Sequence, residues 1–182
     1  MRVAAVTLAL AALLPGCGGS SHRAATTTTP RRPSPGVLLQ RYFDAMGKHE
    51  RRFDTLSERV VETINALDLI RPSKDWPAAA RRLGPVTTGF DRLGVDISKV
   101  KPPSALLDVH VKLAEATVSF GEYVFNLQQA LAAQLPAQLA LAAEADTLSI
   151  RVARREWAKA VTLYAAKVGV TPPVWLVPSP AG

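Results

Sequence analysis

Residues 36–67, GVLLQRYFDAMGKHERRFDTLSERVVETINAL, decide the fold because their inward-type side chains recur every three or four residues. The positions that follow this period are Leu39, Tyr42, Met46, His49, Phe53, Leu56, Val60 and Leu67. Because an α-helix turns once in about 3.6 residues, these positions line one face of a helix. The charged positions outside this face are Arg41, Lys48, Arg52, Glu58 and Arg59. Ser34 and Pro35 are typical of a helix start, and Pro72 is expected to end the helix.

A second helix with the same period is predicted to begin near Asp75 or Trp76. We expect Gly84-Pro85 to kink or split it, because proline lacks the N–H that a helix interior needs. Gly94 is expected to stop it, and residues 95–103 then form a connector.

Two further helices complete the predicted domain. The third begins after Pro102-Pro103, and the fourth is Ala-rich, follows Pro136 and ends at Gly169. No stretch alternates apolar and polar residues as a half-buried strand would. The sequence therefore predicts an all-α domain over residues 36–170, with an up-and-down four-helix bundle as its architecture.

The C-terminal tail, residues 171–182, is rich in proline and apolar around Trp175. The prolines are placed so that the tail cannot form an α-helix. We expect Trp175 to pack back on the bundle, whereas an exposed tail would mark an interaction site.

The N-terminus has the pattern of an export signal. Arg2 supplies a positive charge, and Val3 to Leu14 form an apolar run of about 12 residues, which is too short to span a ~30 Å hydrocarbon core. The run ends in Leu14-Pro15-Gly16-Cys17, which resembles the lipobox of bacterial lipoproteins.

This resemblance implies that residues 1–16 are a signal peptide cut before Cys17, and that diacylglycerol is attached to the Cys17 thiol, with a further acyl chain on the new amino group. Two acyl chains give stable membrane anchoring where one does not. Residues 17–35 are rich in Gly, Ser, Thr, Pro and Arg, so we expect a disordered tether. The expected location is the outer, extracytoplasmic face of the cell membrane.

A second resemblance involves the segment Ile97-Ser98-Lys99-Val100-Lys101-Pro102-Pro103, followed by His110 and Leu113. This arrangement resembles small lipoproteins of high-GC Gram-positive, actinobacterial-type bacteria. Those proteins have a helical domain of uncharacterised function, so the resemblance implies an origin and a fold but no activity.

Charge and cysteine content limit the partners. The chain has 22 Lys+Arg against 15 Asp+Glu, a net charge of +7, and loss of Arg2 with the signal leaves +6. This charge favours anionic partners such as an envelope component, while nucleic acid is the wrong partner outside the cell. The single cysteine, Cys17, allows no intrachain disulfide.

Common catalytic and cofactor motifs are missing from the sequence. No Glu-x-x-His, Cys-x-x-Cys-His, Gly-rich phosphate loop, zinc spacing or Gly-x-Ser-x-Gly occurs. Three arginine pairs are expected on outer or flanking faces, either as solvated surface or as a basic patch: Arg51-Arg52, Arg81-Arg82 and Arg154-Arg155.

We therefore expect a non-enzymatic binding or interaction module of the cell envelope, with no cofactor and no metal. The alternative is a metal- or cofactor-binding bundle, or an enzyme, that uses His49, His110 and Asp146, the residues of these types on apolar helix faces. In an up-and-down bundle these three residues lie at different heights along the helices. We expect that they do not form a common site.

Overall fold

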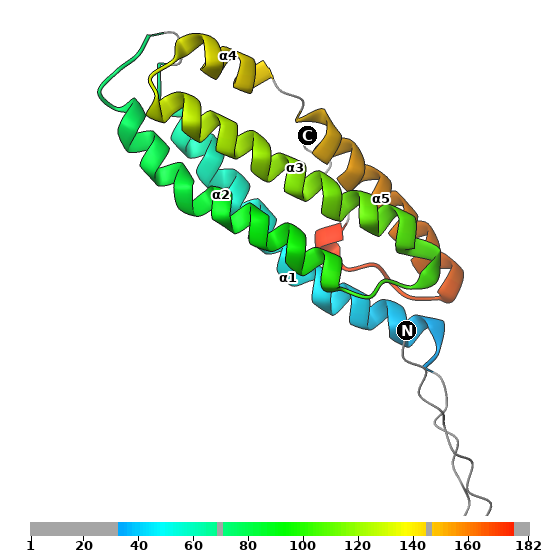
Figure 1. The fold of residues 1–182 in the computed structure, drawn as a ribbon. Coiled ribbons are helices and arrows are strands. Elements are labelled where there is room, and N and C mark those ends of the chain that lie inside the picture. Colours follow the sequence, from blue (N-terminus) through cyan, green and yellow to red (C-terminus); the bar gives the residue numbers. More distant parts are fainter. Residues whose placement is uncertain (1–32, 69–70, 145–146, 177–182) are drawn as a thin grey trace, which may run out of the picture. The chain divides into compact units, whose positions relative to one another are not determined.

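The computed structural model describes residues 33–68, 71–144 and 147–176, and within them the chain is helical without any strand. The helices are α1 (Pro35–Asn65), α2 (Trp76–Lys99), α3 (Leu107–Ala132), α4 (Pro136–Glu144) and α5 (Leu148–Val168), with 3-10 turns η1 (Ser104–Leu106) and η2 (Val174–Leu176). The long helices α1, α2, α3 and α5 lie alongside one another, and α4 packs against α3 (Figure 1). The predicted all-α fold is confirmed. None of the helices in these ranges combines the length and the apolar character needed to cross a bilayer.

Helix α1 begins as predicted but ends earlier. The Ser34 hydroxyl accepts a hydrogen bond from the backbone N–H of Val37 at 3.4 Å, with Pro35 in the first turn. The helix ends at Asn65, and the prediction that it continues to Pro72 was wrong. The indole N–H of Trp76 donates to the carbonyl oxygen of Asp68 at 3.0 Å, so a side chain from α2 holds this part of the chain in a loop.

Helix α2 is continuous from Trp76 to Lys99 with Pro85 inside it, so Gly84-Pro85 does not split the helix, and the predicted stop at Gly94 was wrong. An interior proline costs a helix about 3 kcal/mol. Side chains on both sides of Pro85 are buried in the core, and burial of each large apolar side chain contributes roughly 1.5–3 kcal/mol. Packing of this face therefore outweighs the local penalty. The buried side chains are Leu83, Val86, Phe90, Leu93 and Ile97.

Gly94 marks a close approach of α2 to α3 instead of a helix end. A Cβ atom added at Gly94 would lie 2.5 Å from Cγ2 of Val118 and 3.4 Å from the Val118 backbone nitrogen. Real Cβ contacts are almost never that short, and valine has little freedom to rotate away within a helix. Only glycine fits this crossing without a shift of the two helices.

We expect Gly94→Ala to lower the free energy of unfolding by about 1–3 kcal/mol, because the extra methyl group overpacks the crossing. Urea denaturation followed by circular dichroism measures the change. Gly84→Ala is the matched control, since its Cβ would meet only Gln128 Nε2, at 3.5 Å. Alanine is the better helix former by about 0.5–1 kcal/mol, but Pro85 crowds a Cβ at the preceding position, so the control should be close to neutral. Equal stability of the two variants would contradict the close-crossing explanation.

The predicted fourth helix is two helices, α4 and α5, and this is a correction. Thr147 is the N-cap residue of α5, but its side chain makes no capping hydrogen bond. The apolar period continues across the break because Leu139 of α4 and Ile150 of α5 are both buried. Periodicity alone therefore could not reveal the interruption.

The C-terminal end of the domain follows the prediction closely. Gly169 ends α5 in the left-handed conformation, with φ of 70°. The tail then turns back, and a 3-10 turn at Val174–Leu176 brings Trp175 onto the core, so the expected packing of Trp175 is confirmed. Val177 and the rest of the tail lie outside the described residues.

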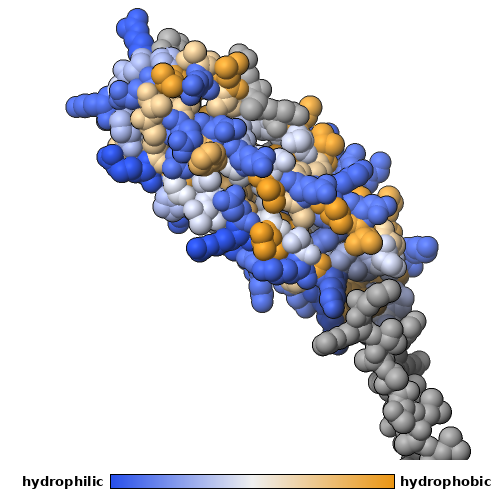
Figure 2. Space-filling view, viewed as in Figure 1, coloured by the Kyte–Doolittle hydropathy of each residue, from blue (hydrophilic) through white to orange (hydrophobic). Residues whose placement is uncertain are grey.

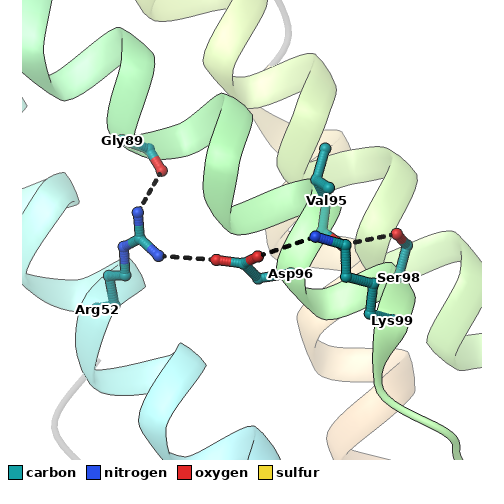
Figure 3. Close-up of polar contacts among 6 residues, drawn as sticks. All are labelled: Arg52, Gly89, Val95, Asp96, Ser98 and Lys99. Atoms are coloured by element: carbon teal, nitrogen blue, oxygen red, sulfur yellow. Dashed lines mark hydrogen bonds and ion pairs between the residues drawn. The ribbon is translucent and has the colours of Figure 1, made fainter.

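Helices α1 and α2 are joined by an ion pair at the domain surface (Figure 3). Arg52 Nη1 lies 3.1 Å from Asp96 Oδ2, and Arg52 Nη2 donates to the Gly89 carbonyl oxygen at 3.5 Å. Lys99 Nζ lies 3.5 Å from the other oxygen of Asp96. All three charged side chains are partly exposed, so this network contributes little stability but fixes how the two helices meet.

The visible surface is mixed in character. Figure 2 shows hydrophilic residues over most of the displayed face, with apolar residues between them. Single exposed apolar side chains are normal on folded proteins, whereas a hollow that combines apolar and charged side chains is informative. Such a hollow exists beside α5.

Candidate functional site

A cleft of about 760 Å³ lies between α5 and the C-terminal segment, with Glu50 of α1 at its edge. Small-molecule sites in proteins usually enclose roughly 300–1,000 Å³. The apolar lining consists of Trp157, Ala158, Leu163, Trp175 and Leu176. The polar and charged lining consists of Glu50, Arg151, Arg154, Arg155, Lys159 and Thr162.

Two tryptophans form the apolar wall. The rings of Trp157 and Trp175 are inclined by only 15°, with centroids 6.2 Å apart, and Phe43 of α1 meets Trp175 edge-on at 6.3 Å. Gly47 allows this arrangement, because a Cβ atom there would lie 3.0 Å from Nε1 of Trp175. The absence of a side chain at one α1 position therefore lets the tail rest directly on the helix.

Arg154 joins α5 to α1 at the cleft. Its Nη2 lies 2.5 Å from Oε2 of Glu50 and 3.0 Å from Oδ1 of Asp54. Its guanidinium carbon also lies 4.3 Å from the centre of the Phe53 ring, a cation–π contact. Of the pair Arg154-Arg155, predicted on an outer or flanking face, Arg154 is partly buried and Arg155 is exposed.

The ionisation of this pair is set by burial and by mutual attraction. Burial raises the pKa of Glu50, and the neighbouring Arg154 charge lowers it, with burial the stronger effect. Burial alone would lower the pKa of Arg154, but Glu50 and Asp54 reverse this and raise it. Arg154 therefore stays charged at every physiological pH.

The other cations of the cleft are not neutralised by the protein. Arg151, Arg155 and Lys159 form no ion pair with any residue that the structure describes. They lie four residues apart on α5, so they follow one row of the helix surface. The cleft thus has a surplus of positive charge beside its aromatic wall.

Behind the wall, a chain of buried hydrogen bonds links three helices. The indole N–H of Trp157 donates to the Tyr42 hydroxyl oxygen at 2.7 Å, and this hydroxyl lies 3.0 Å from Nδ1 of His110. The Tyr42 hydrogen is then free to be donated to Nδ1, which places the imidazole hydrogen on Nε2. Nε2 makes no hydrogen bond with a described residue, while the backbone carbonyl groups of Ile97 and Val100 raise the pKa of His110.

Burial keeps both titratable groups of this chain, Tyr42 and His110, neutral. Burial lowers the pKa of His110, more strongly than the nearby carbonyl groups raise it. Burial also raises the pKa of Tyr42 far above its ordinary value. A neutral imidazole and a protonated phenol are the forms that this hydrogen bond requires. His110 is therefore explained as a core residue that holds α3 to α1 and α5.

The charge of His49 lowers the pKa of His110 and is the smallest of the influences on it. Burial lowers the pKa of His49 itself, and the charge of Asp96 opposes this. Among the described residues, no three His, Cys, Asp or Glu side chains are grouped closely enough to hold a metal ion. Asp146 and Cys17 lie outside the described residues.

Sequence reasoning missed the cleft, although part of its signal was present. Arg151, Arg154, Arg155 and Lys159 recur at three- and four-residue steps, which is the pattern of a basic helix face. Nothing in the sequence, however, places Trp175 against that face. A second depression of about 420 Å³ lies between α3 and α5, where Lys112 pairs with Glu156 at 3.9 Å and Glu115 adds a negative charge, so it has no surplus of cations.

No protein-family model, curated protein or solved structure matches this chain.

Proposed function

We propose that the protein is an exported bacterial lipoprotein, cut before Cys17 and held by lipid at the outer face of the cell membrane. The support is the charged and apolar N-terminus that ends in Leu14-Pro15-Gly16-Cys17. Residues 17–35, which are rich in Gly, Ser, Thr and Pro, then serve as a short tether between the lipid anchor and the helical domain. The helical domain, with α1, α2, α3 and α5 as an up-and-down four-helix scaffold, works in the extracytoplasmic space.

We further propose that the domain is a non-enzymatic binding module whose ligand is an anionic envelope component. The cleft beside α5 carries this proposal, because it combines a volume of about 760 Å³ with an aromatic wall and uncompensated cations. The alternative, a metal site or an enzyme built on His49, His110 and Asp146, is not favoured by any observation among the described residues. His110 already has a structural partner in Tyr42.

Cys17→Ala is expected to abolish lipid attachment, because the thiol is the atom that the lipid would modify. Metabolic labelling of the host with a radioactive fatty acid, followed by recovery of the protein, measures this. Ser20→Ala is the matched control and should label like wild type. Equal label in the Cys17→Ala protein, or release of the unproteolysed wild type into the medium, would refute the anchor.

Native mass spectrometry of the mature protein from its own host tests the binding function. A retained molecule of defined mass would support it. If no molecule is retained, and none of the chemically defined probes described below binds, the binding function is wrong.

A further inference from the structure

We propose that the ligand of the cleft is an anionic amphiphile, an apolar chain that ends in a phosphate-type head. This inference rests on the proposed binding function and names the chemical class of the ligand. It follows from how charge and apolar surface are distributed along one row of α5.

The charged residues of this row, Arg151, Arg155 and Lys159, favour a ligand with an anionic group that has more than one oxygen. Arg151, Arg155 and Lys159 follow each other at four-residue steps, and like charges at this spacing repel and destabilise a helix. Arg154 does not relieve them, since its own charge is engaged by Glu50 and Asp54. An arginine fork matches phosphate or carboxylate geometry, and several adjacent cations favour the more highly charged phosphate.

The same row becomes apolar toward the end of α5. Leu163 lies four residues beyond Lys159, lines the cleft and is 64% exposed. Trp175 and Leu176 of the tail line the cleft with it. Trp157 and Leu176 are already buried, so an apolar chain placed here would cover Leu163 and the exposed part of Trp175. Each square ångström of that surface removed from water stabilises the complex. The head then lies at Arg151 and Arg155, and the chain points toward Leu163 and the tryptophans.

The size of the cleft selects a small molecule over a polymer. About 760 Å³ is a usual volume for a site that buries most of a single small ligand. A polyanion without apolar groups would use the cations and leave Leu163 and the exposed part of Trp175 uncovered. The combination of both surfaces therefore points to an amphiphile.

Calorimetric titration of the mature chain tests this inference. Cys17→Ser keeps that chain free of lipid, so no detergent is needed. Three probes separate head from chain: decyl phosphate below its micelle concentration, decyl maltoside with the same chain and a neutral head, and inorganic phosphate. We expect decyl phosphate to bind at least about tenfold more tightly than either of the others.

Two variants locate the site. The double variant Arg151→Gln/Arg155→Gln should weaken decyl phosphate at least about tenfold and leave decyl maltoside unchanged. Arg92→Gln/Lys74→Gln removes the same charge from exposed positions of α2 and the preceding loop, and should bind like wild type. Leu163→Gln should weaken both decyl probes without risk to folding, since this side chain is exposed.

Results that contradict the proposed ligand class differ from results that contradict the binding function. Equal affinity for decyl maltoside and decyl phosphate, or equal weakening by the two charge variants, would overturn the inference and leave the binding function standing. Binding to phosphatidylglycerol vesicles without binding of decyl phosphate would also overturn it, because the basic face would then dock on a membrane surface. If no probe binds and no molecule is retained from the host, the binding function itself fails.

Discussion

Replacement of Tyr42 by phenylalanine is expected to remove about 2–4 kcal/mol from the free energy of unfolding, because one hydroxyl serves two buried partners. Without it, the indole N–H of Trp157 loses its acceptor and Nδ1 of His110 loses its donor. Both residues are only 2% exposed, so water cannot replace the missing hydroxyl. A buried polar group left without a partner costs about 1–3 kcal/mol.

Urea denaturation at neutral pH measures this loss, and Tyr164→Phe is the matched control. Tyr164 is partly exposed, and its hydroxyl has no hydrogen-bond partner among the described residues, so its removal should change stability by less than about 0.5 kcal/mol. Two variants of equal stability would mean that the Trp157–Tyr42–His110 chain contributes nothing. The result also bears on the cleft, since Trp157 forms its wall.

The sequence predicted which faces of the helices are buried, but not which residues meet across them. Tyr42, His110 and Trp157 all fall on predicted inward stripes, and all three are buried. A period of 3.6 residues gives the direction of a side chain around the helix axis. It does not give the height at which neighbouring helices meet, so the hydrogen bonds among these residues could not be foreseen.

The errors in helix boundaries have a common physical cause. Gly84-Pro85 and Gly94 are local signals for a break or a stop, yet α2 continues through them. Packing against α3 decides both positions, since Gly94 permits the close crossing with Val118. Gly169, by contrast, has no neighbour within 4 Å of an added Cβ, and there the local signal for a helix end was correct.

The cleft could be foreseen only in part for a related reason. Its basic row lies within one helix, so the four-residue spacing of Arg151, Arg155 and Lys159 can be recognised in the sequence. Its apolar wall needs Trp175, which reaches Trp157 only because the tail turns back and Gly47 leaves room. Contacts between segments so far apart in the chain depend on the folded backbone.

The second large effect is expected from Arg154→Met, which keeps much of the side-chain length but removes the charge. Glu50 is 8% exposed and would lose the cation at 2.5 Å. Removing one partner of a buried ion pair costs about 3–5 kcal/mol, and the partial exposure of Arg154 places this case near 3 kcal/mol. Arg155→Met is the control and should have little effect, because Arg155 is exposed and has no ion pair with a described residue.

The penalty should depend on pH in a definite direction. Burial already raises the pKa of Glu50 above its ordinary 4.5, and the variant lacks the Arg154 charge that lowers it. A carboxyl whose pKa is higher in the folded state binds more protons when folded, so stability falls as pH rises through that interval. The difference between wild type and Arg154→Met is therefore largest at and above neutral pH, and it shrinks as pH falls toward 4.5.

The double variant Glu50→Gln/Arg154→Met separates the charge from the packing. This variant has no carboxylate at position 50 that could be buried without a partner, so it should recover most of the stability that Arg154→Met loses. Its free energy of unfolding should also no longer depend on the titration of residue 50. Urea denaturation at several pH values between 4.5 and 8 covers the relevant range. If the double variant is as unstable as Arg154→Met at every pH, the contact of Arg154 with Phe53 is what matters, and the ion pair only orients it. Recovery would show that the charge of Glu50 holds Arg154 at the cleft, which leaves the row Arg151, Arg155 and Lys159 to meet an anion.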